Sequence, residues 1–289
     1  AYWLDSLSGS CSMGCGKMDK IPVSVLITTK NEEKNILRCL ESCKNFSEVI
    51  VIDSHSNDKT IKIARDYGAQ VELFKWNGLY PKKRGWCLEN LDIKHDWVFW
   101  VDADEVLTPE IISEIAEIFN TSPSIAGYFV KGKYVWKGQV LSYGMYNNKL
   151  ALFNRHKIEF PVIDDLDIEG MGEIEGHYQP ILKVACIEPI AQIKSPLLHY
   201  AYEDETAWEV RHHRYAHWEA EMTRKNAWPQ DPDPKREAFK KAIRRSILRP
   251  YIIFIYSYIW KLGFMDGHAG YDFAKSRLRY CRMIRKNLT

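Results

Sequence analysis

The chain has 289 residues, of which 46% are hydrophobic and 27% charged, and its formal net charge is +2. This composition is that of a globular protein and excludes an intrinsically disordered chain. No apolar run approaches the about 20 residues that a membrane-spanning helix needs, and the N-terminus lacks the pattern of a secretory signal. Seven Cys residues, spread thinly, argue against a disulfide scaffold and favour a reducing, cytoplasmic setting.

The length predicts one large domain, or one domain with an appendage. Residues 1–17 are rich in Ser and Gly and precede Met18, so we expect a tag or a flexible leader there. We expect the main domain over residues 18–226 and a helical extension over residues 227–289. The segment WPQDPDP (228–234) is typical of a linker between the two.

Strand and helix patterns alternate through the first 120 residues. Short apolar runs rich in β-branched residues predict four buried strands, over residues 21–28, 48–53, 70–74 and 97–102. Helical spacing predicts four helices, over residues 31–44, 57–67, 82–92 and 108–120. Ser56 is expected to cap the second helix and Gly68 to end it, whereas Thr108-Pro109-Glu110 starts the fourth. This alternation predicts right-handed βαβ units and a parallel sheet.

The pattern changes after residue 121. Two runs, over residues 127–136 and 149–153, are typical of strands in a mixed sheet. Residues 155–180 are rich in Gly, Asp and Glu and indicate a loop, and residues 203–226 indicate a polar helix with aromatic residues on it.

Polar residues stand at the carboxyl ends of the predicted strands, where open parallel sheets bind ligands. Asp53 follows the second strand, and Asp102-Ala103-Asp104 follows the fourth. Two carboxylates two residues apart on an extended segment reach the same side of a sheet edge, and their oxygens suit Mg2+ or Mn2+. Such triplets also occur in loops that only cap helices. Neither a G-x-G-x-x-G nor a G-x-x-x-x-G-K-[ST] motif occurs, which disfavours a dinucleotide site and a P-loop.

Three motifs in order carry a resemblance to a known family. They are VSVLITTKNEEKNI (23–36), EVIVIDSHSNDKT (48–60) and DWVFWVDADE (96–105). Through them the chain resembles the inverting family 2 glycosyltransferases of the GT-A fold, and it is similar to bacterial enzymes that add sugars to lipopolysaccharide core or other envelope glycans. The resemblance implies an α/β, Rossmann-like fold with a mostly parallel central sheet flanked by helices, and a catalytic domain over residues 18–226.

The resemblance also implies a nucleotide-sugar donor, in our interpretation UDP-linked, and a Mn2+ or Mg2+ cofactor. Asp104 would be the principal metal ligand, Asp102 would contact the metal or the ribose, and Asp53 would accept a hydrogen bond from the uracil imide. The other residues implied at the nucleotide are Thr28 and Glu32 or Glu33 at the base and ribose, and Lys83 and Arg84 at the diphosphate. Alternatively, Asp53 caps the next helix, and the two basic residues form a solvated helical turn.

Sugar transfer to a hydroxyl needs a general base opposite the leaving group, because a hydroxyl is a poor nucleophile. In GEIEGHYQP (172–180), an extended backbone places Glu173 and Glu175 on one face. We predict that one of these two is the base, with a slight preference for Glu175. Related envelope enzymes usually carry a His-Glu pair here, whereas this sequence has Glu-Gly-His, and we place His177 near the donor or acceptor. The acidic residues of 164–169 are expected to be mostly solvated.

Two more residues enter through the resemblance. His199 would be a further metal or phosphate ligand, or else an ordinary half-buried residue beside Tyr200. Arg155, in a segment that resembles the family's L-F-x-R turn, would touch the donor sugar, or else is solvated. His213 and His217 lie four residues apart on the predicted helix but lack the H-E-x-x-H glutamate of zinc proteases, so we expect a surface helix.

The C-terminal segment is strongly basic. Residues 235–289 hold fourteen Lys and Arg against three acidic residues, a net charge of +11 that leaves −9 for the rest of the chain. Within it, ILRPYIIFIYSYIWKLGF (247–264) is too short to span a bilayer but is rich in Tyr and Trp and flanked by cations, as interfacial helices are. We therefore expect peripheral contact of residues 247–289 with the inner face of the cytoplasmic membrane. A core helix or a homodimer interface is the alternative.

The sequence thus predicts a metal-dependent inverting glycosyltransferase that moves a sugar from a nucleotide-diphosphate donor to a hydroxyl of a glycan or lipid-linked glycan. Transfer to a polyprenyl phosphate or to a peptide is the enzymatic alternative. A nucleic-acid-binding protein that uses the basic tail is the alternative without catalysis. It leaves the ordered carboxylates unexplained, so nucleic acid is not expected as a partner.

Overall fold

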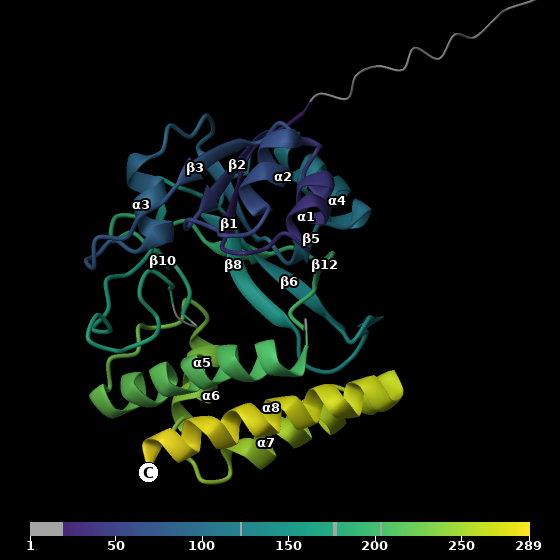
Figure 1. Cartoon of the computed structure of the whole chain (residues 1–289), viewed down its shortest axis with the longest axis vertical. Helices are drawn as coiled ribbons and strands as arrows, with labels where there is room; N and C mark the ends of the chain where they lie inside the picture. Colours follow the sequence, from purple (N-terminus) through teal and green to yellow (C-terminus); the bar gives the residue numbers. More distant parts are fainter. Residues whose placement is uncertain (1–19, 122, 176–177, 203) are drawn as a thin grey trace, which may run out of the picture.

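The computed structural model describes residues 20–289 except 122, 176–177 and 203. The expected leader (1–17) and His177 therefore lie outside the described residues. Figure 1 shows a twisted sheet with its flanking helices in one part of the molecule and a layer of helices from the C-terminal third beneath it.

The parallel half of the sheet confirms the four predicted strands. These strands are β1 (Ile21–Thr29), β2 (Phe46–Asp53), β3 (Gln70–Leu73) and β4 (Trp97–Asp102). They pair in parallel in the order β3-β2-β1-β4, so the chain after β1 and the chain after β4 leave the sheet side by side. Neighbouring strand ends of this kind form the switch point at which open sheets bind ligands.

The second half of the sheet is mixed, as the runs after residue 121 indicated. Two long strands, β6 (Gly127–Trp136) and β8 (Asn147–Asn154), pair antiparallel to each other, and β8 pairs antiparallel to β4. The sheet path then continues from β6 to β12 and β5. The short strands are β5 (Glu105–Val106), β7 (Gln139–Val140), β11 (Ile190–Gln192) and β12 (Leu197–His199), with β9 (Ile158–Glu159) and β10 (Ile181–Leu182) in a separate pair.

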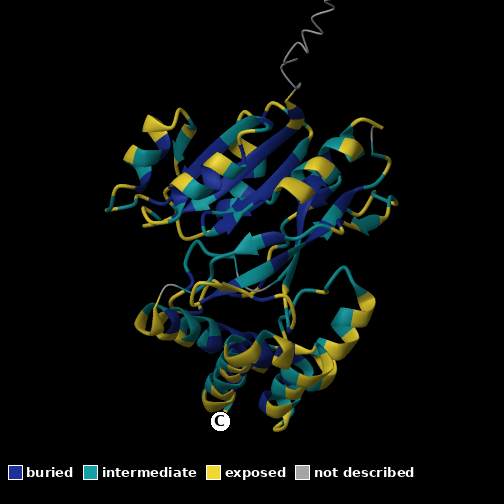
Figure 2. Cartoon of the chain, turned by 90° about the vertical axis from the view of Figure 1, so that its right-hand side faces the viewer, coloured by how far each residue is buried: buried dark blue, intermediate teal, exposed yellow. Residues whose placement is uncertain are grey.

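Helices cover both faces of the sheet. They are α1 (Ile36–Ser42), α2 (Thr60–Asp66), α3 (Lys83–Asn90) and α4 (Pro109–Phe119). One buried cluster joins β1 to apolar residues of α1, α2 and α4, and a second, on the other face, includes Cys87 of α3. Figure 2 shows buried residues concentrated in the strands of this part. The helices correspond to the predicted ones, although α1 and α2 are shorter.

The expected cap at Ser56 is wrong, and its true contacts explain the shorter helices. Ser56 Oγ accepts a hydrogen bond from the backbone N–H of Asn31 at 2.7 Å and donates one to Asp53 at 2.6 Å. The segment after β1 is thereby held as a turn against the segment after β2, and α2 starts only at Thr60. The cap at Thr108 is confirmed, because Thr108 Oγ1 accepts the N–H of Ile111 at 3.3 Å.

The C-terminal layer holds α5 (Glu205–Lys225), α6 (Pro234–Ile243), α7 (Arg249–Ile255) and α8 (Gly267–Leu288). A π-helical turn (Tyr256–Trp260) follows α7. Trp208 and Ala216 of α5 are buried against Phe273 and Tyr280 of α8 in one apolar cluster. The layer thus begins with α5, so the boundary expected after residue 226 falls between two helices of the same layer. Within the described part of the chain, no helix is long and apolar enough to cross a membrane.

Candidate active site

A cleft of about 1480 Å³ lies between the carboxyl ends of β1 and β4 and the C-terminal helices. Thr28, Asp102 and Asp104 line its sheet wall, and residues of α5, α7 and α8 line its helical wall. The position is the one that the strand-end rule predicts for ligands of an open sheet. Of the predicted site residues, Glu32, Lys83, Arg84, Glu173, Glu175 and His199 also line this cleft.

The strand register brings the polar strand ends together. Thr28 lies opposite Asp102, and Thr29 lies opposite Asp53. Asp53 is fully buried, and its carboxylate accepts hydrogen bonds from Thr29 Oγ1 at 2.8 Å and from the N–H and hydroxyl of Ser56 at 2.7 and 2.6 Å. Asp53 therefore holds two loops together and is not among the residues that line the cleft, and its contact with the uracil of the donor stays a prediction.

Glu32 and Glu33 also differ in whether they line the cleft. Glu32 lines the cleft, and its backbone N–H donates to Thr60 Oγ1 at 2.7 Å. Glu33 is exposed, and its carboxylate accepts the backbone N–H of Lys59 at 3.1 Å. Glu33 thus joins the turn after β1 to the start of α2, and of the two carboxylates only that of Glu32 lines the cleft.

Two cations neutralise Asp102. Arg84 Nη2 donates to its Oδ1 at 2.7 Å, and Lys149 Nζ lies 2.9 Å from its Oδ2. Lys149 also lies 2.5 Å from the buried Glu105 Oε2, which accepts the backbone N–H of Asp102 at 2.9 Å. Burial would raise the pKa of Asp102, but Lys149 and Arg84 hold that pKa well below its usual range. Asp102 is therefore ionised, and its carboxylate orients Arg84 and Lys149.

Asp104 has a different environment. Its Oδ2 lies 3.3 Å from Nε2 of His199, and its Oδ1 receives no hydrogen bond from a described residue. Burial would lower the pKa of His199, but the carboxylate of Asp104 raises it overall. His199 Nδ1 is buried and has no partner among the described residues. The ring stacks on Tyr134, with centroids 5.2 Å apart, which fixes its plane.

These donors fit a divalent cation only together with ligand oxygens. In the described residues, no three His, Cys, Asp or Glu side chains are grouped so that they could hold a metal alone. Asp104 offers a carboxylate oxygen, which suits Mg2+ or Mn2+, and the imidazole of His199 beside it favours a transition metal such as Mn2+. A diphosphate and water would have to complete the coordination.

The two candidate bases meet the basic pair at the start of α3. Lys83 Nζ lies 3.4 Å from Glu173 Oε1, and the backbone N–H of Arg84 donates to Glu175 Oε1 at 2.6 Å. Burial raises the pKa of Glu175 and lowers that of Lys83. All four residues line the cleft, so the structure brings together the predicted carboxylates and the predicted cations.

Arg155 does not belong to this site, which corrects its predicted contact with the donor sugar. Because β8 runs antiparallel to β4, Asn154 lies opposite Trp97, at the start of β4. That edge is about 16–17 Å from Asp102, given five strand residues and a rise of about 3.3 Å for each. There Arg155 Nη2 donates to the carbonyl of Ile93 at 3.2 Å.

Sequence reasoning missed several residues that build the site. Lys149 appeared only as part of a strand, although a Lys inside an apolar run is itself a signal of a buried partner. Asp165 was expected to be solvated, yet it is 1% exposed and pairs with the buried Lys82 at 2.7 Å. Trp218 of α5 also donates to Asp165 at 3.0 Å, so this pair joins the loop under the cleft to the helical layer.

Comparison with known proteins identifies the family. The model of glycosyl transferase family 2 matches residues 24–169, half of the chain, and the chain belongs to this family. A glycosyltransferase of Rickettsia typhi, described as uncharacterized, is 32% identical over 167 residues, which are 53% of this chain and 56% of that protein. The lipopolysaccharide core biosynthesis glycosyltransferase LpsC of Rhizobium meliloti is 30% identical over 116 residues, 38% of this chain and 42% of that protein. The chain thus spans about half the length of these curated relatives.

Solved structures agree on the fold. The mannosyltransferase PcManGT from Pyrobaculum calidifontis, solved in complex with GDP-Man and Mn2+, has a TM-score of 0.51 at 14% identity, over 93% of this chain and 87% of that chain. The fold is therefore the GT-A fold that the motifs implied, with its sheet mixed in the second half.

Proposed function

We propose that this protein is a metal-dependent inverting glycosyltransferase that transfers a sugar from a nucleotide diphosphate, UDP in our interpretation, to a hydroxyl of a glycan or lipid-linked glycan. One observation carries the proposal: Asp104, which lies beside His199 and has a carboxylate oxygen that no described residue engages, lines the same cleft as Lys83 and Arg84. Family membership and the similarity to LpsC support a sugar-transfer reaction on an envelope glycan.

In the proposed mechanism, the donor diphosphate lies between Asp104 and the first turn of α3. A divalent ion held by Asp104 and His199 would supply charge neutralisation of the leaving diphosphate. Arg84, aligned by Asp102, and Lys83 add fixed positive charge on the other side. Thr28 and Glu32, at the end of β1, line the part of the cleft proposed for the nucleoside.

Glu175 is the proposed general base, with Glu173 as the alternative. The amide of Arg84 fixes Oε1 of Glu175, and no described residue donates to Oε2. Burial raises the pKa of Glu175, which brings it nearer to a working pH around neutrality. Glu173 is less suited because its carboxylate is already engaged in an ion pair with Lys83 at 3.4 Å. One displacement by the acceptor hydroxyl would invert the anomeric centre.

The end of the helical layer supports an acceptor at a membrane. Residues 247–265 expose a set of large apolar side chains, here called the apolar end: Ile247, Leu248, Tyr251, Ile255, Ile259, Trp260, Leu262, Phe264 and Met265. Arg282 and Arg285 of α8 lie next to it, within hydrogen-bond reach of Tyr251 and Ile247. Apolar and aromatic side chains beside cations favour the interface of an anionic bilayer. We propose that residues 227–289 hold the catalytic unit (18–226) at the inner face of the membrane.

Calorimetry of nucleotide binding tests the proposal. UDP, GDP and CDP are titrated into the full chain with Mn2+ and with EDTA. We expect one nucleotide, UDP first, to bind at least about tenfold more tightly with Mn2+, since a metal bridge adds charge-assisted contacts to the diphosphate. If no nucleotide binds, or if Mn2+ has no effect, the proposed function is wrong.

A further inference from the structure

The cations that line the cleft differ in whether a carboxylate pairs with them. On the sheet wall, Lys83, Arg84 and Lys149 each lie within 3.4 Å of a carboxylate. On the helical wall, three arginines line the cleft without a carboxylate partner among the described residues: Arg211 and Arg214 of α5, and Arg277 of α8. We call these three residues the arginine wall.

None of the three guanidinium groups is fully exposed, and none is neutralised by an acid of its own wall. Arg211 donates to the carbonyl of Ala201 and forms no ion pair with a described residue, although its charge helps to lower the pKa of Asp104. Arg214 lies over the ring of Tyr215 at 5.3 Å, and its Nε is buried without a partner in the described part of the chain. The nearby carboxylate of Glu219 is already engaged, by Arg249 at 2.7 Å and by Tyr280 at 2.6 Å.

Arg277 completes the wall from the other helix. Its guanidinium lies 5.2 Å from the ring centre of Tyr280 and forms no ion pair with a described residue. Burial raises the pKa of Tyr134; the positive charges of Arg277 and Arg211 oppose that rise, whereas the carboxylates of Glu105 and Asp104 add to it. Tyr134 in turn stacks on His199, which contacts Asp104. The arginine wall therefore lines the same cleft as the candidate metal ligand.

Half-buried cations without counter-ions are costly, because their hydration is reduced and nothing replaces it. An anionic ligand would remove that cost, and arginine forks match the geometry of phosphate and carboxylate groups. The rings of Trp136 and Trp208, which border the same part of the cleft, are buried, and that of Tyr134 packs on His199 and Phe273, so these aromatic residues form a rigid support for the arginine wall. The surroundings thus fit an anion site.

We propose that the arginine wall binds an anionic group of the acceptor, a phosphate or a carboxylate carried next to the sugar that receives the transfer. The assignment of this anion to the acceptor rests on the proposed function, whereas the existence of the anion site does not. The donor diphosphate has its own cations in Lys83 and Arg84, at the start of α3. The acceptor class is then an acidic or phosphorylated glycan rather than a neutral one.

The test measures anion preference without using the nucleotide site. Glucose 6-phosphate, glucuronate and glucose are titrated by ligand-observed NMR against the full chain in EDTA at constant ionic strength. We expect at least one of the two anionic sugars to bind about tenfold more tightly than glucose, because hydrogen bonds to charged groups are the strong ones. Tighter binding of glucose 6-phosphate would indicate a phosphate site, and tighter binding of glucuronate would indicate a carboxylate site.

Variants assign the preference to residues. The double variant Arg211→Gln/Arg277→Gln should bind the anionic sugars no more tightly than glucose, whereas Arg277→Lys alone, which keeps the charge, should retain part of the preference. Lys275→Gln is the matched control, since it removes one charge from an exposed position of α8 outside the cleft. Lys275→Gln should keep the full preference. Circular dichroism and the melting temperature show whether each variant is folded.

Each outcome of these titrations either supports or overturns the proposed anion site. No preference in the wild type, or a preference that survives in the folded double variant, overturns the inference. A double variant that loses about tenfold in nucleotide affinity with Mn2+ also overturns it, because the arginines then serve the donor. If no nucleotide binds but the anionic sugars do, the proposed function fails and the anion site stands. If a nucleotide binds and the anionic sugars show no preference, only this inference fails.

Discussion

Arg84 donates a hydrogen bond through Nη2 to Oδ1 of Asp102 at 2.7 Å. With Lys149 at 2.9 Å on the other oxygen, Asp102 has both oxygens engaged by cations, whereas Asp104 two residues later has an oxygen without such a partner among the described residues. The two carboxylates of one short motif therefore have different surroundings. Asp102 positions the cations, and Asp104 is the residue that we propose for the metal.

Replacing Asp104 separates these two functions. In Asp104→Asn, the gain in nucleotide affinity on adding Mn2+ should disappear, because an amide is a weaker ligand for a hard cation. Asp96→Asn is the control, since Asp96 is an exposed carboxylate at the opposite edge of the sheet, 2.9 Å from His156. Calorimetry with and without Mn2+ measures both. A full metal effect in Asp104→Asn would exclude Asp104 as a ligand.

Glutamine at the two candidate bases tests the mechanism. Glu175→Gln should lower kcat by about 100- to 10,000-fold, the usual contribution of a general base, and leave nucleotide affinity within about twofold. Glu173→Gln should keep most of its turnover, because Glu173 is paired with Lys83. Turnover is followed as nucleotide release in the presence of acceptor. The reverse ranking of the two variants would assign the base to Glu173.

The buried pair of Lys82 and Asp165 is predicted to be a major contributor to stability. Their side chains are 1% and 0% exposed, so Lys82→Met leaves an uncompensated buried charge and should cost about 3–5 kcal/mol of unfolding free energy. The exposed pair of Lys62 and Asp66, at 74% and 62%, provides the control, and Lys62→Met should cost about 0–1 kcal/mol. Urea unfolding at pH 7 compares them. Equal costs would contradict the argument from burial.

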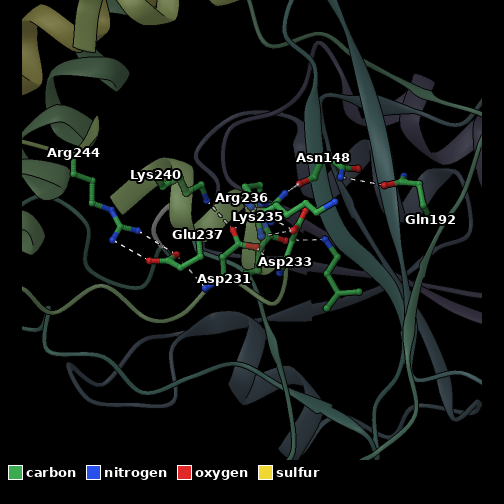
Figure 3. Close-up of polar contacts among 11 residues, drawn as sticks. Asn148, Gln192, Asp231, Asp233, Lys235, Arg236, Glu237, Lys240 and Arg244 are labelled. Carbon is green, nitrogen blue, oxygen red and sulfur yellow. Dashed lines mark hydrogen bonds and ion pairs between the residues drawn. The ribbon is translucent and has the colours of Figure 1, made fainter. Parts of the chain in front are cut away.

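Asp231 is predicted to stabilise the start of α6 in a pH-dependent way. Its Oδ2 accepts hydrogen bonds from Arg236 at 2.7 Å and Lys240 at 2.9 Å (Figure 3). Burial alone would raise the pKa of Asp231, but these bonds lower it overall. A carboxyl with a lowered folded pKa stabilises the fold above its unfolded pKa, and this stabilisation is lost as the pH falls through the folded value.

Asp231→Asn should therefore be less stable than the wild type at pH 7, by about 1–3 kcal/mol, as expected for hydrogen bonds to charged groups. The difference should shrink once the pH falls below about 4, near the ordinary pKa of Asp. Asp164→Asn, at a side chain that is 74% exposed beside Lys225, should show little change at either pH. Urea unfolding at pH 7 and at pH 3 measures this, and a difference as large at pH 3 as at pH 7 would contradict the assignment.

The apolar end should bind anionic vesicles. Ile259→Ser/Trp260→Ser removes side chains that are 53% and 78% exposed and should weaken binding to phosphatidylglycerol vesicles by about tenfold or more, given the apolar area lost from the interface. Val184→Ser, at an exposed apolar residue between β10 and β11, is the control and should bind as the wild type does. Vesicle co-sedimentation is the measurement. Unchanged sedimentation together with loss of a dimer in light scattering would make the apolar end a dimer interface.

The sequence predicted what depends on local pattern. Runs such as IPVSVLIT and WVFWVD are apolar and β-branched over the length of a buried strand, and the first of these was placed to within one residue of β1. Thr108-Pro109 marked the start of α4 because capping is a contact within four residues. Ser56 misled the same reasoning, since its partner Asn31 is 25 residues away and no local pattern contains it.

The strand-end rule pointed to Asp102 and Asp104. The resemblance added Lys83 and Arg84, and the need for a general base added the pair of glutamates to the same predicted site. The hydrogen-bond and ion-pair partners of those residues could not be predicted from the sequence. Lys149 reaches Asp102 across an antiparallel strand pairing, and Asp53 turned into the protein because Thr29 and Ser56 both donate to it. Arg155 was misplaced because strand direction decides which edge a strand end occupies, and direction is a property of pairing.

The sequence by itself determined the strand–helix order of the first 120 residues, the family motifs and the excess of positive charge near the C-terminus. Only the tertiary structure decided which of those charges are paired. A charge pattern does not state distances, and the electrostatic energy of an ion depends on its distance to a counter-ion and on its burial. The pairing of the sheet-wall cations and the lack of carboxylate partners for Arg211, Arg214 and Arg277 among the described residues therefore became visible only when α5 and α8 were placed against the sheet.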